Sequence, residues 1–207
     1  HKGVALTNQQ KVFWPDEGYT KGDLINYYAT VAEFILPHLK DRPMSLKRNP
    51  NGIKDEGFYH KDAGENAPSF VKVFPVQSES SNKVIDYIVC NNQKTLLYLA
   101  NLGCIEMNPW NSRTQKPDNP TWLSIDIDPS EKNTFKEVVD VALVVKEICD
   151  IAKLTSYCKT SGASGLHVYI PLRNKYDYET VRNFAKLIAG MVQEKLPDTT
   201  SIVRSLK

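Results

Sequence analysis

The chain has 207 residues, of which 41% are hydrophobic and 24% are charged, and its formal net charge is +2. This composition excludes a bundle of membrane-spanning helices, since no apolar run approaches the roughly 20 residues of a membrane span, and it allows one or two buried cores. The small charge gives no indication of nucleic-acid binding, so any basic surface must be local. The densest candidate for a basic surface is the cluster Lys40, Arg42, Lys47 and Arg48. Such a cluster is more plainly interpreted as a solvated face.

The sequence of the first half of the chain, about residues 1–103, predicts two helices and several short strands. A helix capped by Thr20 is expected to run to about His38, with one apolar stripe along its length. A second helix over 93–102 is expected to stop at Gly103. Turn-rich pieces separate the strands that the sequence predicts over 44–48, 58–60, 70–76 and 84–90.

The second half, about residues 104–207, alternates strands with longer helices. Its first strand is expected over 104–107, and the next carries Asp126 and Asp128. A helix from Thr134 to about 153 begins with a capping box to Glu137. Strands over 155–159 and 166–172 and a helix over 178–196 follow. Helices alternating with short strands predict an α/β (α+β) fold.

The four cysteines, Cys90, Cys104, Cys149 and Cys158, have neither Cys-x-x-Cys nor zinc-finger spacing. Reduced structural thiols in a cytosolic protein are therefore expected. The sequence opens at His1 without a secretory apolar region, which is typical of a piece of a longer protein or of a tag remnant.

Asp126 and Asp128 lie two residues apart in an otherwise apolar, strand-like run, Ser-Ile-Asp-Ile-Asp-Pro. The period of a strand places both carboxylates on one face, where they repel each other unless a cation lies between them. A hard divalent ion such as Mg²⁺ or Mn²⁺ is the natural occupant. The alternative is a strand end whose two carboxylates face water and cap the next turn.

The segment Thr-Ser-Gly-Ala-Ser-Gly over 160–165 is a turn of small residues that leads into an alternating strand. Its glycines allow close backbone approach, and its hydroxyls, Ser161 among them, suit phosphate oxygens. If Leu166 and Val168 face the core, His167 points to the opposite face. Such a turn is often only a connection between strands, and a lone histidine is usually structural. The combination of both with the acidic pair is a stronger indication of a functional site.

The two motifs SIDIDP and TSGASGLHVYIPL closely resemble those of the polymerase domain of bacterial ligase D proteins, within the archaeo-eukaryotic primase superfamily. The likeness extends over nearly the whole chain, with further anchors at 11–15, 19–24, 27–28, 42–52 and 108–113. The resemblance implies a primase-type catalytic core, with a mixed sheet flanked by helices, in the second half. A smaller N-terminal α/β part is expected to pack against it.

The chemistry that the resemblance implies is nucleotidyl transfer to a 3′ hydroxyl with two Mn²⁺ or Mg²⁺ ions. Asp126 and Asp128 would be the metal ligands. Ser161 and His167 would contact the phosphates or sugar of the nucleotide, and Lys47 would supply a positive charge to the same phosphates or to the nucleic acid.

Five further positions match residues that contact nucleotide or DNA in the family. Asn108 stands where many relatives carry a histidine; its amide can bind a ribose hydroxyl but cannot become a cation. Phe58 and Tyr59 match aromatic residues used against DNA, although one ring could instead pack inward. Lys11 and Lys21 match lysines that hold the 5′ phosphate of a gap, although exposed lysines are usually solubility charges.

The function implied is a template-dependent polymerase that fills gaps with a preference for ribonucleotides during non-homologous end joining in the bacterial cytoplasm, associated with the nucleoid. Its partners would be NTP or dNTP, DNA with 5′-phosphorylated gaps or ends, Ku, and the ligase and nuclease modules of the same polypeptide. Two alternatives remain open: a catalytically incomplete module that binds DNA ends, and a metal-dependent nucleotide-sugar glycosyltransferase.

Relatives carry a third metal-binding carboxylate shortly after the position that matches 204–207. The sequence therefore predicts that this chain, C-terminally truncated relative to the family, extends primers slowly, because two carboxylates leave much of the charge of two divalent ions uncompensated. The alternative is that Glu106, Glu137 or Asp177 supplies the third ligand.

Overall fold

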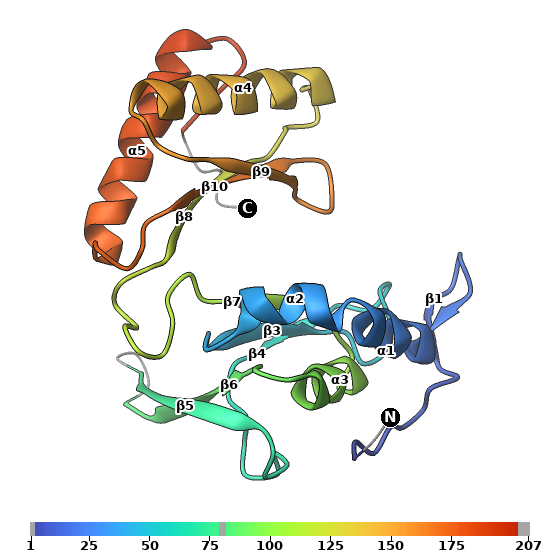
Figure 1. The fold of residues 1–207 in the computed structure, drawn as a ribbon. Coiled ribbons are helices and arrows are strands. Elements are labelled where there is room, and N and C mark those ends of the chain that lie inside the picture. Colours follow the sequence, from blue (N-terminus) through green and yellow to red (C-terminus); the bar gives the residue numbers. More distant parts are fainter. Residues whose placement is uncertain (1–2, 79–81, 203–207) are drawn as a thin grey trace. The chain divides into compact units, whose positions relative to one another are not determined.

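The computed structural model of the chain describes residues 3–78 and 82–202, which form two compact units. The first unit spans His1–Gln115 and the second spans Lys116–Lys207 (Figure 1). The sequence-based division near 103 differs from this boundary, because the strand after Gly103 pairs with a strand of the first unit. That strand, β7 (Cys104–Pro109), therefore belongs to the first unit.

The first unit begins with a small hairpin that was not predicted, β1 (Val12–Trp14) and β2 (Tyr19–Thr20). Thr20 caps α1 (Lys21–Thr30) through a capping box with Asp23, as its position predicts. The single helix expected to run to His38 is instead two, since α1 ends at Thr30 and α2 covers Ala32–Leu39. Thr30 and Val31 are adjacent β-branched residues, which weakens the helix at this point.

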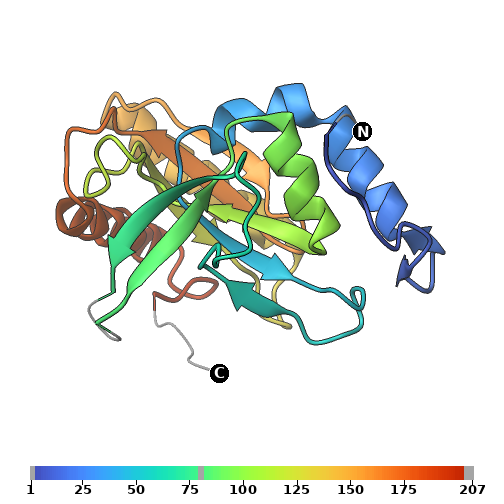
Figure 2. The ribbon, with the colours of Figure 1, turned by 90° about the horizontal axis from the view of Figure 1, so that it is seen from below.

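A three-stranded antiparallel sheet lies in the first unit, in the order β4-β3-β7. Its strands β3 (Met44–Arg48) and β4 (Phe58–His60) have the predicted bounds. A separate antiparallel hairpin, green in Figure 2, joins β5 (Lys72–Gln77) to β6 (Val84–Val89). Helix α3 (Gln93–Asn101) ends before Gly103, whose φ of +76° is the left-handed turn that the glycine predicted.

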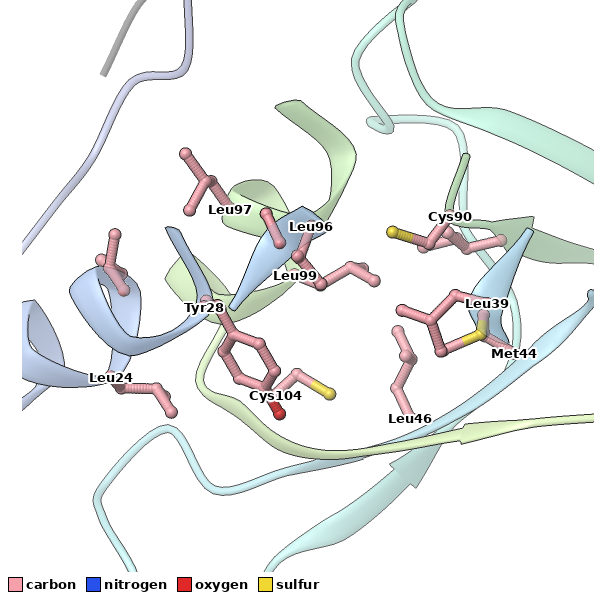
Figure 3. Close-up of a cluster of buried hydrophobic side chains, with 14 of the residues drawn as sticks. Leu24, Tyr28, Leu39, Met44, Leu46, Cys90, Leu96, Leu97, Leu99 and Cys104 are labelled. Atoms are coloured by element: carbon pink, nitrogen blue, oxygen red, sulfur yellow. The ribbon is translucent and has the colours of Figure 1, made fainter. Parts of the chain in front are cut away.

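The core of the first unit lies between its helices and one face of the three-stranded sheet. Tyr28 of α1 lies among the apolar side chains that Figure 3 labels, and its hydroxyl donates to the carbonyl of Ile105, 2.8 Å away. This bond ties α1 to β7. Leu96 and Leu99 of α3 and Leu46 of β3 are almost completely buried in the same cluster.

The second unit is a three-stranded sheet in the order β8-β10-β9 with two helices, α4 and α5 (Figure 1). Its elements are β8 (Trp122–Ile127), α4 (Phe135–Ile151), β9 (Tyr157–Thr160), β10 (Leu166–Pro171) and α5 (Tyr178–Lys195). The α/β class is confirmed, but every strand pairing among the described residues is antiparallel. The mixed sheet expected in the catalytic core is therefore not formed there, because the short turn 161–165 returns β10 directly alongside β9.

The two faces of this sheet differ in polarity. Leu166, Val168 and Ile170 of β10 are buried against apolar side chains of α4 and α5, so the intervening residues point to the other face. Helix α4 begins with the predicted capping box between Thr134 and Glu137. Among the described residues, no helix has the length and apolar character that crossing a membrane requires.

Candidate active site

In the second unit, the acidic pair and the histidine lie at one end of the sheet face opposite the helices. The strand register places His167 of β10 directly beside Asp126 of β8 on one side and Lys159 of β9 on the other. All three side chains share the face opposite the helices. The structure therefore aligns a carboxylate, an imidazole and an ammonium group across three strands.

His167 contacts Asp126 directly, with 3.1 Å between Nε2 and Oδ1. A hydrogen on Nε2 satisfies this contact, because a carboxylate can only accept. The other ring nitrogen, Nδ1, is buried and has no partner among the described residues. In the tautomer with hydrogen on Nε2, this nitrogen keeps its lone pair as a free acceptor.

Asp128 lies one residue beyond β8, beside the turn that precedes β10. A Cβ added at Gly165 would lie 2.3 Å from the carbonyl oxygen of Ile127 and 3.0 Å from Oδ1 of Asp128, so only glycine fits here. In the same turn, Oγ of Ser161 accepts from the amides of Ala163 (3.2 Å) and Gly165 (3.1 Å). These bonds fix the oxygen and leave its own hydrogen available to a phosphate.

Asp126 and Asp128 both line a pocket of about 540 Å³ in the second unit. Their oxygens are the donors that Mg²⁺ and Mn²⁺ prefer, so the pair fits one side of a divalent-metal site. No group of three potential metal ligands occurs in the part of the chain that the structure describes. Residues 204–207, where the resemblance places the approach to a third carboxylate, lie outside the described residues.

The three carboxylates considered as a third ligand are engaged elsewhere. Glu106 pairs with Lys47 in the first unit, with 3.0 Å between Oε1 and Nζ. Glu137 lines the same pocket as Asp126, but its Oε2 accepts from the amide and hydroxyl of Thr134 at 2.6 and 2.9 Å. Asp177 caps α5 by accepting from the amide of Thr180 at 2.7 Å.

In the first unit, one face of the sheet carries three of the predicted nucleotide and DNA contacts. Lys47 of β3 lies in register with Tyr59 of β4 and Glu106 of β7, and two residues earlier Ser45 faces Asn108. Lys47, Tyr59 and Asn108 therefore share a face. Hydrogen bonding and charge from Glu106 raise the pKa of Lys47, so the ammonium form is favoured.

The basic cluster predicted at residues 40–48 does not form a continuous charged surface. Arg42 is buried, and its Nη1 donates to the carbonyls of Trp110 and Asn111 at 2.9 and 2.7 Å. The guanidinium of Arg48 lies over the ring of Phe58, 5.2 Å from its centroid, and Nε donates to the carbonyl of Leu102. Both arginines therefore serve the packing of the first unit.

Phe58 and Tyr59 are both exposed, at 47% and 67% of their surface, so neither ring packs into the core. They alternate along β4, and only Tyr59 shares the face of Lys47. The sequence places the two rings together, whereas the structure directs them to opposite sides of the strand.

Lys11 and Lys21 lie at the base of the β1–β2 hairpin but have different environments. Lys11 is exposed and donates to Oδ1 of Asn51 at 2.6 Å. Lys21 keeps only 6% of its surface exposed, and its Nζ donates to the carbonyl of Thr7 at 2.7 Å. Burial, and then the charges of Lys11 and Arg48, lower the pKa of Lys21.

Three residues that the sequence reasoning missed contribute to these arrangements. Thr7 and Asn51 hold the two lysines, and Lys159 joins the row of His167 and Asp126. No local signal marks Lys159, because its place beside His167 depends on the length of the turn between β9 and β10.

Comparison with known proteins identifies the family of this chain. The family model for the LigD primase-polymerase domain matches residues 20–207. The bifunctional non-homologous end joining protein LigD of Bacillus subtilis is 33% identical, over 100% of this chain and 33% of that protein. The multifunctional non-homologous end joining protein LigD of Mycolicibacterium smegmatis is 28% identical, over 100% of this chain and 27% of that protein.

A solved structure is similar over almost the same extent. The polymerase domain from Mycobacterium tuberculosis ligase D, in complex with DNA, matches with a TM-score of 0.88 and 28% identity, covering 99% of this chain and 74% of that one. The chain spans a third or less of the two LigD proteins compared above. Because the family model covers nearly all of it, this chain belongs to the family of LigD primase-polymerase domains.

Proposed function

We propose that this chain is a DNA-end polymerase that adds nucleotides, with a preference for ribonucleotides, to a 3′ hydroxyl during gap filling in non-homologous end joining. The observation that carries the proposal is the meeting of Asp126, Asp128, Ser161 and His167 around one end of β10. Family membership supports it, as does the similarity to the polymerase domain from Mycobacterium tuberculosis ligase D, which was solved in complex with DNA.

Each residue of this group has a distinct part in the proposed function. Asp126 and Asp128 would hold Mg²⁺ or Mn²⁺, which supplies positive charge to the phosphates and reacting oxygens. The hydroxyl of Ser161 donates to a phosphate oxygen, since two backbone amides already orient its lone pairs. His167 positions Asp126 and presents its ring to the nucleotide.

Residues of the first unit would contribute binding contacts. Lys47 neutralises phosphate charge, and the amide of Asn108, on the same sheet face, binds a ribose hydroxyl. Lys21 suits a 5′ phosphate because, among the residues that the structure describes, the hydrogen-bond partners of its buried ammonium are the neutral oxygens of Thr7. Tyr59 offers an exposed ring for stacking on a base, and Phe58 offers its own on the other side of β4.

Metal binding tests the acidic pair independently of turnover. Free Mn²⁺ measured by electron paramagnetic resonance should fall when the chain is added, and Asp126→Ala or Asp128→Ala should weaken this binding at least tenfold. Asp140→Ala is the matched control, because Asp140 lies on the exposed side of α4 with Lys136 as its partner. Equal Mn²⁺ binding by all of these proteins would refute the metal assignment.

Primer extension then tests the reaction. On a gapped duplex with a 5′ phosphate and Mn²⁺, the chain should incorporate NTP faster than dNTP, and the two aspartate variants should lose incorporation while they still bind DNA. DNA binding without Mn²⁺ binding or extension would identify a DNA-end-binding module instead. A glycosyltransferase would ignore the duplex, and the family assignment already disfavours that alternative.

The family of this chain also indicates which proteins it works with. The relatives are named for non-homologous end joining, so we infer that this domain works beside Ku and a ligase module, and with a nuclease module where one is fused. Co-purification with Ku on DNA ends, compared with free Ku, tests this association.

A further inference from the structure

A second cavity, of about 840 Å³, opens at the end of the second unit's sheet that is remote from the acidic pair. Asp126 and His167 pair near the start of β10, whereas Ile170, Pro171 and Leu172 line the cavity at its end. At about 3.3 Å per strand residue, His167 and Pro171 are roughly 13 Å apart. The cavity is lined by residues of β9, β10 and the first turns of α5, and by the segment that follows α4. Figure 1 labels these elements.

The cavity has an apolar floor and a cationic rim. Its floor comes from Leu154, Ile170, Leu172, Val181 and Phe184. The rim carries Lys153, Arg173 and Lys175, and none of these makes an ion pair among the described residues. Three uncompensated cations around one opening favour an anionic ligand.

The nearby carboxylates do not neutralise this rim. Asp150 pairs with Lys146, and Asp177 is occupied as the cap of α5. Neither carboxylate lines the cavity.

The backbone at the rim is held in an uncommon conformation. Lys153, Arg173 and Asn174 all have φ of +55°, a left-handed region that residues other than glycine rarely adopt. Glycine would adopt this conformation more easily but would remove the charge at two of the three positions. These φ values follow from local turns. Lys153 lies in the turn that ends α4, where the amide of Leu154 donates to the carbonyl of Cys149 at 2.8 Å, and Arg173 and Asn174 form the turn between Leu172 and Lys175.

Exposed tyrosines accompany the cations. Tyr157 and Tyr176 line the cavity with 58% and 50% of their surface exposed. Tyr157 is also in register with Tyr169, whose ring lies 6.2 Å from that of His167. Tyr157 therefore lies on the sheet face opposite the helices and borders the cavity from the edge strand β9.

We propose that this rim binds a single-stranded segment of nucleic acid, with phosphates on Lys153, Arg173 and Lys175 and bases against Tyr157 and Tyr176. Flat exposed rings interleaved with cations are typical of single-strand binding, because every base has a face that can stack. An acidic peptide would need only the cations, so the exposed rings favour nucleic acid. The proposal extends the proposed function, whose substrate is also a nucleic acid.

Fluorescence anisotropy with a labelled oligothymidylate, titrated over a range of salt, tests the site. The rim variant is Lys153→Gln, Arg173→Gln, Lys175→Gln. The control has the same change of charge on exposed residues of the same unit, Lys132→Gln, Arg182→Gln, Lys186→Gln, none of which lines the cavity. Losing three phosphate contacts should reduce the slope of log K against log salt by about 2 in the rim variant alone.

The aromatic contribution has its own variant. Tyr157→Ala with Tyr176→Ala should weaken the oligonucleotide at least fivefold at constant salt, since stacking on a ring typically contributes about that much or more per base. Circular dichroism and thermal unfolding confirm that every variant is folded. Equal salt slopes for the rim and control variants would overturn the proposal, as would an unchanged affinity in the tyrosine variant.

Two further arms separate the outcomes. Displacement of the oligonucleotide by poly-glutamate, together with normal binding by the tyrosine variant, would replace this site with one for an acidic peptide. Mn²⁺ binding should be unchanged in the rim variant. If Asp126→Ala instead left Mn²⁺ binding intact while the rim still bound the oligonucleotide, the proposed polymerase function would fail and this site would stand.

Discussion

Replacing Gly165 with alanine should destabilise the second unit and disturb the acidic pair at the same time. The added Cβ would lie 2.3 Å from the carbonyl oxygen of Ile127, and real contacts of this kind are essentially never shorter than 3.0 Å. The neighbouring residues Leu166 and Ile127 are paired in the sheet, so the backbone of β8 or β10 must move to make room. Overpacking of this kind costs about 1–3 kcal/mol.

Gly190 of α5 provides a matched control with the opposite sign. A Cβ at Gly190 meets nothing within 4 Å, so Gly190→Ala replaces a helix-interior glycine without a clash. It should stabilise the chain by about 0.5–1 kcal/mol. At roughly 2–4 °C per kcal/mol for a chain of this size, Gly165→Ala should lower Tm by roughly 2–12 °C and Gly190→Ala should raise it slightly.

Mn²⁺ binding is the second measurement on the same two variants. A Cβ at Gly165 would also lie 3.0 Å from Oδ1 of Asp128, so the carboxylate must shift and its affinity for Mn²⁺ should fall. Gly190→Ala should bind Mn²⁺ as the unaltered chain does. A Gly165→Ala protein with unchanged stability, within about 0.5 kcal/mol, and unchanged Mn²⁺ affinity would refute the argument that this turn has no room for a side chain.

Three further outcomes are expected. Lys11→Ala with Lys21→Ala should erase the preference for 5′-phosphorylated over 5′-hydroxyl gaps. Because burial lowers the pKa of Lys21, this preference should also decline at a lower pH than it would with an ordinary lysine. Lys21→Arg should preserve the preference. In the native chain, a thiol-specific chromogenic reagent should react fast with one thiol, that of Cys158, and Cys158→Ser should remove this reaction. The other three cysteines, Cys90, Cys104 and Cys149, are buried, and burial raises the pKa of Cys90 and Cys104 to about 12. Several fast-reacting thiols would contradict this packing. Asn92→Ala should cost about 1 kcal/mol in urea unfolding, since Oδ1 of Asn92 caps α3 by accepting from the amide of Thr95, whereas Asn92→Asp should lose much less.

Local sequence signals predicted most elements of the fold. The capping box at Thr134 and Glu137 located the start of α4, and Gly103 located the end of α3, because both signals act within a few residues. The β1–β2 hairpin escaped prediction because its strands are only three and two residues long. The break at Val31 escaped because the apolar stripe continues across it.

In the candidate site, too, the sequence predicted local features but not contacts between distant segments. The alternation of residues along single strands correctly predicted that His167 faces away from the core. The partners of these residues could not be predicted, because Lys47 finds Glu106, and His167 finds Asp126, only through the pairing of distant strands. Burial of Arg42 and Lys21 likewise depends on segments far away in the sequence.

If this chain has the proposed function, the contact between His167 and Asp126 would link the binding of a metal ion to the binding of a nucleotide. A nucleotide that drew the imidazole toward itself would free Oδ1 of Asp126 for a cation, and a cation on Asp126 would release the imidazole for a nucleotide. Linkage of this kind is reciprocal, so each ligand raises the affinity for the other by the same factor. A single 3.1 Å contact would thus make occupancy of the metal and nucleotide positions cooperative.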